Sequence, residues 1–134
     1  MLHHARRRAA ALERRVTLVA GDAQRLPFPD RTFDSIAFTL CLCTVPDPVR
    51  AMAEGLRVAR PGARIILFEH VRSSLWPVAL VQDLISPLTV LLGEDHFNRR
   101  TLEVARAAGV EVESVRRWGL GAVILAVGRK PASS

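Results

Sequence analysis

The order of the apolar runs restricts this chain to a small group of folds. Three runs of strand length come first, at residues 16–20, 36–43 and 65–68, and each is followed by polar or turn residues. A helical pattern joins the second run to the third, as expected where crossover helices connect parallel strands. The last two runs, 110–115 and 122–127, are too close for a crossover helix and must pair antiparallel. The sequence predicts an α/β fold whose mostly parallel sheet ends in an antiparallel hairpin.

The composition favours one globular domain over residues 1–134. Hydrophobic residues make up 49% of the chain and charged residues 24%, which suffices for a core and excludes a disordered composition. No internal repeat or linker marks a second domain.

The net charge of +6 comes almost entirely from arginine, since Lys130 is the single lysine. A basic chain suggests nucleic acid or an anionic membrane as a partner. The arginines are scattered, however, and no aromatic side chains lie among them to stack on bases. We therefore expect no nucleic-acid partner.

Cys41 and Cys43 lie two residues apart in one apolar run. If this run is a strand, both side chains face one side of the sheet. The spacing is poor for a disulfide, and no second cysteine pair completes a metal site, so we expect two small buried side chains and no metal. Nothing at the N-terminus resembles a signal peptide, and the sequence predicts a reducing, cytoplasmic location.

Helix signals occur at three places. Residues 1–15 have helical spacing without an N-cap. Asp47-Pro48 predicts an N-cap followed by proline in the first turn, and Pro61-Gly62 is expected to end that helix. Residues 98–108 form the last predicted helix, with Asn98 as its cap, Phe97 packed on Leu102 and Gly109 as its end. The buried stripe of the middle helix is predicted to be Val49, Met52, Ala53 and Leu56.

Ligands of open α/β sheets bind at the carboxyl ends of the strands. The predicted strands place Asp22-Ala23, residues 39–44 and Glu69-His70 at these ends. Asp22 has two interpretations there. Its carboxylate can accept a hydrogen bond from an adenine amino group while the Ala23 N–H donates to a ring nitrogen, or it can cap its own loop.

A longer set of residues carries a family resemblance. The set comprises Gly21-Asp22-Ala23, Leu26-Pro27-Phe28, Asp30, Phe33-Asp34, Val45-Pro46-Asp47 and Arg60-Pro61-Gly62-Ala63-Arg64. It resembles the ubiquinone/menaquinone-biosynthesis (type 11) family of class I methyltransferases, which use S-adenosylmethionine (SAM), over essentially the whole chain. The resemblance implies a Rossmann-like fold, SAM as the cofactor, Asp22 and Ala23 against the adenine, and Thr39 or Leu40 beside the ribose and methionine.

The chain departs from the family pattern at its beginning. The family starts with a strand, a Gly-x-Gly-x-Gly loop, a helix and a second strand that ends in an acid for the ribose. None of the eight glycines forms such a loop after a strand, and Gly119-Leu120-Gly121 lies between the last two strands. The resemblance thus implies the C-terminal two-thirds of the fold, with two strands missing. We expect the isolated chain to lack the main cradle for SAM and to expose strand edges open to self-association.

Methyl transfer requires the acceptor to be held in line with the methyl group, and a base only if the acceptor loses a proton. Glu69, His70 and His96 are the candidate bases, and each also has a structural interpretation at a strand end, loop or cap. Glu69-His70-Val71 and His96-Phe97-Asn98-Arg99 resemble a subgroup that contains small-molecule thiol and phospholipid-type methyltransferases.

Residues 74–93 form a long apolar stretch. Asp83, Pro77 and Pro87 interrupt it, so it is not expected to span a membrane. It is interpreted as a lid over an acceptor pocket, as core, or as a peripheral contact with a membrane surface. We expect a SAM-dependent methyltransferase with a small-molecule or lipid-like acceptor. The alternative is a non-catalytic remnant, or half of a split enzyme, that acts as an interaction module.

Overall fold

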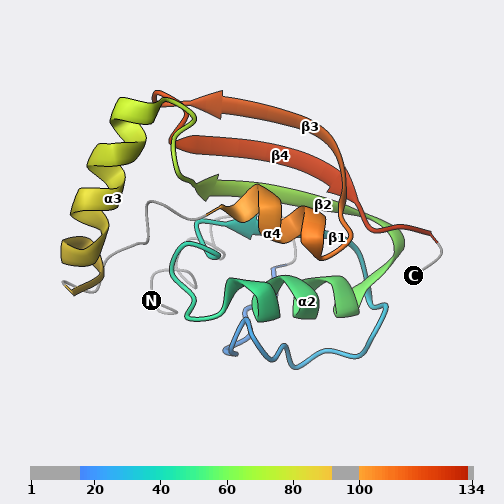
Figure 1. The fold of residues 1–134 in the computed structure, drawn as a ribbon. Helices are drawn as coiled ribbons and strands as arrows, with labels where there is room; N and C mark the ends of the chain where they lie inside the picture. Colours follow the sequence, from blue (N-terminus) through green and yellow to red (C-terminus); the bar gives the residue numbers. More distant parts are fainter. Residues whose placement is uncertain (1–15, 92–99, 133–134) are drawn as a thin grey trace.

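The computed structural model describes residues 16–91 and 100–132. Over these residues four strands form one open sheet, and three helices accompany it (Figure 1). The elements in chain order are β1 (Phe33–Thr39), α2 (Pro48–Val58), β2 (Ala59–His70), α3 (Trp76–Leu91), α4 (Thr101–Ala107), β3 (Glu111–Trp118) and β4 (Val123–Arg129). The predicted helix at 1–15, and Phe97 and Asn98 of the last predicted helix, lie outside the described residues.

The strand order is β1-β2-β4-β3. β1 and β2 pair parallel, whereas β4 pairs antiparallel with both β2 and β3, so three of the four strands run in the same direction. The prediction of an α/β sheet that ends in an antiparallel hairpin is confirmed. β3 lies at an edge, as its alternation of apolar and charged residues indicated.

The predicted strand at 16–20 is wrong. These residues belong to no strand, and the local β pairing is an isolated bridge between Asp22 and Arg25. Within the described sheet, β1 has β2 on one side and no strand on the other. A β-branched run becomes a strand only where a neighbour takes its backbone N–H and C=O groups, and this run has none among the described residues.

β1 also differs from its prediction, because it ends at Thr39 rather than at Cys43. The chain leaves the strand at Leu40, whose φ is +48°. A turn follows, in which the Thr44 and Val45 N–H groups donate to the Cys41 carbonyl over 3.1 Å. Cys41 and Cys43 therefore do not share one face of a strand. Neither forms a disulfide, and Cys43 is buried.

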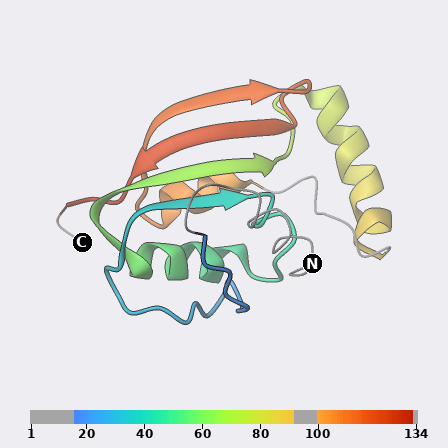
Figure 2. The same ribbon diagram turned by 180° about the vertical axis from the view of Figure 1, so that it is seen from behind.

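The hydrophobic core lies on one face of the sheet, beneath α2 and α4 (Figure 2). Alternate residues of β2 and β4 point into it, and so do residues of both helices. These residues are Ile65, Leu67, Ile124, Ala126, Ala51, Met52, Leu102 and Ala105. The opposite face of β2 is less covered by the described residues, since Phe68 points to that face and is 38% exposed.

α2 begins as predicted but is rotated from the expected stripe. The Asp47 carboxylate accepts the Arg50 N–H over 2.9 Å, and Pro48 opens the helix. Met52 is buried as predicted, whereas Val49 is 60% exposed and Ala51, Gly55 and Val58 take the other buried positions. Gly55 explains the rotation, because the Phe38 ring lies where a side chain of residue 55 would begin.

Pairing in the sheet ends α2, and a glycine ends α4. α2 ends at Val58, three residues before the expected Pro61, because Ala59 already pairs with Phe33 of β1. Gly62, with φ +75°, then lies in an irregularity of β2. Gly109, with φ +92°, ends α4 as predicted.

Candidate functional site

The carboxyl ends of β1 and β2 lie side by side, with Thr39 opposite Phe68 in the sheet register. α3 and the carboxyl end of β3 lie at the same edge (Figure 1). The loops that leave the two parallel strands are the place where an α/β sheet binds its ligand. Their geometry decides what each candidate residue can do.

Glu69 is 0% exposed, and its carboxylate faces the loop after β1. Oε1 accepts the N–H groups of Cys41 and Leu42 over 2.9 and 3.0 Å, and Oε2 accepts that of Cys43 over 3.3 Å. A general base needs a lone pair within reach of the acceptor, whereas both of these oxygens are engaged and screened from solvent. The geometry favours a positioning role, in which Glu69 fixes three consecutive peptide groups beside the site.

Cys41 lies in this clamped loop, partly buried. Burial, and secondarily the charge of Glu69, raises the pKa of its thiol. The thiol is therefore protonated at neutral pH and is a poor nucleophile. The expectation of two small buried side chains holds for Cys43, whereas Cys41 is only partly buried.

Asp22 is exposed and caps its own loop. Oδ1 accepts the Gln24 N–H over 2.8 Å, and the Arg25 N–H donates to the Asp22 carbonyl over 3.0 Å. The hydrogen bond from the Gln24 backbone lowers the pKa of Asp22. Gln24 also accepts the Asp47 N–H over 3.0 Å through Oε1, which joins the loop to the start of α2. Capping leaves the exposed carboxylate able to accept a further hydrogen bond, so both interpretations of Asp22 are compatible with the geometry.

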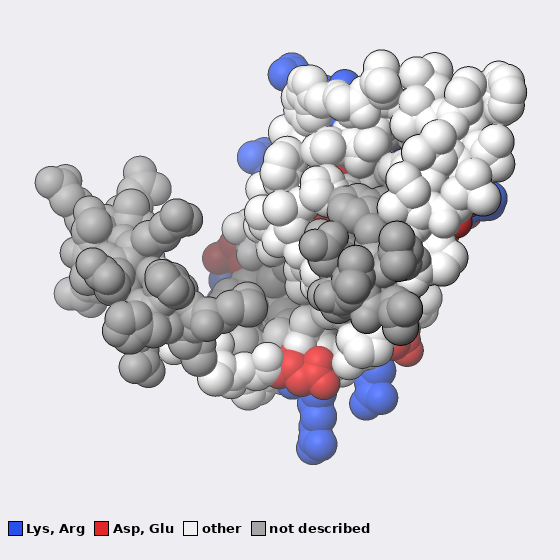
Figure 3. Space-filling view, turned by 90° about the vertical axis from the view of Figure 1, so that its left-hand side faces the viewer, with Lys and Arg blue, Asp and Glu red and all other residues white. Residues whose placement is uncertain are grey.

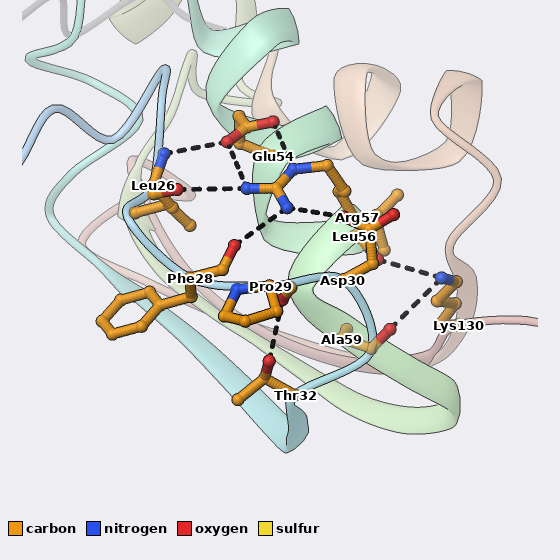
Figure 4. A network of polar contacts seen from close by, with 10 residues as sticks. All are labelled: Leu26, Phe28, Pro29, Asp30, Thr32, Glu54, Leu56, Arg57, Ala59 and Lys130. Carbon is orange, nitrogen blue, oxygen red and sulfur yellow. Dashed lines mark hydrogen bonds and ion pairs between the residues drawn. The ribbon is translucent and has the colours of Figure 1, made fainter.

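A network centred on Arg57 holds the segment after Asp22 against α2 (Figure 4). The guanidinium donates to Glu54, to the Leu26 and Phe28 carbonyls and to Asp30, at distances of 2.6–3.1 Å. Glu54 Oε2 in turn accepts the Leu26 N–H over 2.8 Å. These bonds, that from Arg57 foremost, lower the pKa of Glu54 to about 2. This network was not predicted from the sequence, because its one local signal is the Glu54–Arg57 spacing of three on a helix.

The other candidates lie at the same edge of the sheet. Thr39 and Leu40 are exposed at the end of β1, and His70 is partly exposed at the end of β2. His96 lies outside the described residues. Within the described residues, no three His, Cys, Asp or Glu side chains gather in a way that would hold a metal ion.

A family model described as a methyltransferase domain matches residues 1–67, half of the chain. The chain belongs to the class I methyltransferases. S-Adenosylmethionine is the cofactor of this family. The resemblance seen in the sequence is thereby confirmed.

Two curated relatives are named demethylmenaquinone methyltransferase. The protein from Mycolicibacterium paratuberculosis is 34% identical over 117 residues, which cover 82% of this chain and 46% of that protein. The protein from Thermobifida fusca is 43% identical over 74 residues, which cover 55% of this chain and 31% of that protein. The chain thus spans less than half of the length of these relatives.

Solved structures show the same fold. A possible histamine N-methyltransferase from Thermotoga maritima superposes with a TM-score of 0.73 at 24% identity, over 97% of this chain and 69% of that one. The [4+2]-cyclase SpnF superposes with a TM-score of 0.70 at 21% identity, over 96% of this chain and 61% of that one. At these identities the likeness concerns the fold alone.

The residues present fit one side of SAM. The exposed Asp22 carboxylate and the adjoining Ala23 backbone offer the acceptor and donor that an adenine edge requires. The sequence contains no Gly-x-Gly turn after a strand to approach the rest of the molecule closely. The fit is therefore to the adenine side.

Proposed function

We propose that the protein transfers a methyl group from SAM to a small, apolar acceptor of quinone-like or lipid-like character. The observation that carries the proposal is the carboxyl edge of β1 and β2, where the buried Glu69 fixes the loop after β1 and Gln24 joins the Asp22 loop to α2. Membership of the methyltransferase family and the names of the two relatives support it.

The chain's own residues bind SAM and keep the surrounding loops in position. Asp22 accepts from the adenine amino group, the Ala23 N–H donates to a ring nitrogen, and Thr39 and Leu40 line the ribose and methionine side. Glu69 keeps the peptide groups of residues 41–43 in place. Bound SAM supplies a methyl group already activated by its positively charged sulfur, so alignment of the acceptor is the main task of the protein.

Proton removal concerns His70 and His96. His70 is partly exposed at the end of β2, and we propose that it takes a proton from a hydroxyl or thiol acceptor. His96 stays a candidate from the sequence. A change of His70 to asparagine should lower kcat more than it raises KM for SAM, as expected for a group that acts on the acceptor.

The 134-residue chain alone is expected not to bind SAM at micromolar concentration, because its sequence has neither the glycine loop nor the ribose acid. Equilibrium dialysis with labelled SAM tests this expectation. Fusion of a segment with a strand, a Gly-x-Gly-x-Gly loop and a ribose-binding acid ahead of Met1 should give SAM binding, and then transfer of labelled methyl to a demethylated naphthoquinol. A folded fusion that binds no SAM contradicts the proposed function, and binding without transfer contradicts the acceptor class.

Variants of the fusion test the adenine assignment. Asp22→Ala should raise the Kd for SAM by about tenfold, the loss of one good hydrogen bond to a charged group. Asp34→Ala is the matched control, since Asp34 is an exposed aspartate paired with Arg60 over 2.6 Å on the amino-terminal half of β1. Equal effects of the two changes would remove Asp22 from the site. Measurement of methyl transfer itself is required because one protein of the same fold is named a cyclase.

A second candidate function is an interaction module, completed by another chain. It rests on the outer edge of β1, which pairs with no strand among the described residues. Such an edge offers backbone groups to a further strand. Light scattering on the eluting chain separates the candidates, because a stable complex supports completion by another chain and a clean monomer argues against it.

We also propose a reducing, cytoplasmic location. Neither Cys41 nor Cys43 forms a disulfide, and a raised thiol pKa at Cys41 slows its oxidation. Fractionation of cells with an antibody to the chain tests the location, and recovery outside the cytoplasm would contradict it.

A further inference from the structure

α3 is turned the opposite way from a helix of a globular core. The side chains on its inward side are mostly polar or small: Ala79, Gln82, Asp83 and Ser86, with Val78 also partly buried. Those on its outward side are large and apolar, with exposures of 46–77%: Trp76, Leu80, Val81, Leu84 and Ile85. Spacings of four place them along one broad face of the helix. α3 therefore buries polar side chains and exposes apolar side chains to water.

Specific polar contacts fix this orientation. Gln82 accepts the Ser73 N–H over 2.7 Å and donates to the Val71 carbonyl over 3.0 Å. Arg72 donates to the Asp83 carboxylate over 2.8 Å. The loop after β2 is thus hydrogen-bonded to the polar side of α3, and rotation of the apolar face inward would break these bonds.

The apolar face continues beyond α3. Ser73 donates its hydroxyl to the Leu120 carbonyl, which joins the start of α3 to the turn between β3 and β4. Leu75, Trp118 and Leu120 are exposed large apolar residues of these segments. Together with the outward residues of α3 they form a surface that we call the apolar end. Patches of this kind mark interaction sites rather than ordinary protein surface.

The charges around the apolar end identify the kind of partner. Asp83 is the single charged residue of α3, and it lies on the inward side paired with Arg72. The exposed Arg116 and Arg117 precede Trp118, and the whole chain carries a net charge of +6. Figure 3 shows a broad uncharged surface at this end, with both basic and acidic side chains further out. An apolar face beside the exposed Arg116 and Arg117, on a chain of net positive charge, complements a bilayer with anionic headgroups.

We propose that the apolar end docks on the surface of a bilayer that contains anionic phospholipid. The apolar side chains of α3 enter the boundary between headgroups and acyl chains, and Arg116 and Arg117 meet lipid phosphates. Among the described residues, no helix has the length and apolar character needed to cross a membrane, so α3 lies in the plane of the interface. The proposal goes beyond the proposed function, because docking is measured without methyl transfer.

Co-sedimentation of the 134-residue chain with vesicles tests the docking. Vesicles of phosphatidylcholine with roughly one-third phosphatidylglycerol should bind the chain, and phosphatidylcholine alone should bind it weakly. Replacement of Leu80 and Leu84 together by serine should lower the partition coefficient by roughly 10- to 100-fold, since two leucines leave the lipid. Val49→Ser is the matched control, because Val49 is an equally exposed apolar residue on α2, and it should leave binding unchanged.

Fluorescence locates the contact. In a Trp118→Phe variant Trp76 is the single tryptophan, and brominated lipids should quench it and shift its emission to the blue. Unchanged far-UV circular dichroism of the serine variants shows that they fold. Equal binding of serine variant and parent overturns the proposal, and so does the absence of binding to either vesicle. A dimer in light scattering that the serine variants dissociate would assign the apolar end to a second copy instead, and would also overturn it.

Discussion

α2 and α3 both follow a strand and the loop at its carboxyl end, yet they present opposite sides to the sheet. α2 buries Ala51, Met52, Gly55 and Val58 and turns its charged residues outward or into the Arg57 network. α3 turns Gln82, Asp83 and Ser86 inward and leaves large apolar side chains in water. The two helices therefore have different tasks: α2 builds the core that supports the site, whereas α3 displays a surface.

The difference also appears in how the two helices are anchored. The loop before α2 is held by the carboxylate of Glu69, which is fully buried. The loop before α3 is held by the amide of Gln82, which is half-buried and neutral. Loss of a hydrogen-bond partner lowers the stability more at a buried charge than at a half-exposed amide. The anchoring of α2 should therefore be the more sensitive to substitution.

Truncation of one apolar residue on each helix should give the largest contrast. Met52→Ala should lower the free energy of unfolding by about 2–5 kcal/mol, because it leaves a cavity under α2. Leu84→Ala should change it by less than about 0.5 kcal/mol, because Leu84 is 72% exposed. Denaturant titrations followed by circular dichroism measure both. A large cost at Leu84 would show that α3 is part of the core and would break the comparison.

The two anchors provide the next contrast. Glu69→Gln puts an NH2 group against a backbone N–H and should cost about 2–3 kcal/mol. Hydrogen exchange of the Cys41, Leu42 and Cys43 amides should become faster in this variant. Gln82→Ala should cost about 1 kcal/mol, since two neutral hydrogen bonds are replaced by bonds to water. Equal costs for the two changes would contradict the difference in anchoring.

The acid sensitivity of the α2 side sharpens the comparison. The pKa of Glu54 is lowered from 4.5 to about 2, so its ionised form stabilises the fold. This contribution, of roughly 1.5 kcal/mol for a charged hydrogen bond, is complete above the unfolded pKa and is lost as the pH falls from about 4.5 towards 2. Glu54→Gln should flatten this limb of the stability–pH curve. Glu103→Gln on α4, where the carboxylate is exposed and 3.5 Å from Arg100, is the control and should leave the limb unchanged.

The start of α2 gives the smallest effect. Asp47→Ala removes the oxygen that accepts the Arg50 N–H and should cost about 1 kcal/mol. Asp47→Asn keeps that acceptor and should recover most of the loss. Thermal unfolding of the three proteins measures the difference. An equal loss in both variants would show that the charge, rather than the cap, matters at this position.

Features set by neighbouring residues could be predicted from the sequence. Asp47-Pro48 starts α2, Gly109 ends α4, and the short connection through Gly119 and Gly121 makes the last two strands antiparallel. Each signal acts within a few residues, so its physical cause is visible in the sequence. The family resemblance added the expectation that Asp22 and Ala23 contact the adenine, which no local signal provides and which stays a prediction.

Features set by distant residues could not be predicted. A β-branched run at 16–20 has the composition of a strand, but pairing depends on a neighbour that the run does not specify. β1 ends at Thr39 because the chain turns at Leu40 and the N–H groups of residues 41–43 go to the side chain of Glu69, which lies 26–28 residues further along. For α3, an apolar composition fits core, lid and surface equally, and the direction of its face is decided by contacts of Gln82 and Asp83 with the loop after β2.

The bonds from Glu54 and Arg57 to residues 26–28 span 28–31 positions of the chain. Closing a loop of that size costs entropy that must be offset by contacts already formed. Residues 26–28 should therefore become ordered late in folding, after α2 has formed and can bind them. Since the same segment follows Asp22, the loop proposed to contact adenine should assemble late and loosen early. Substitutions that destabilise α2 should therefore loosen this loop before they unfold the sheet.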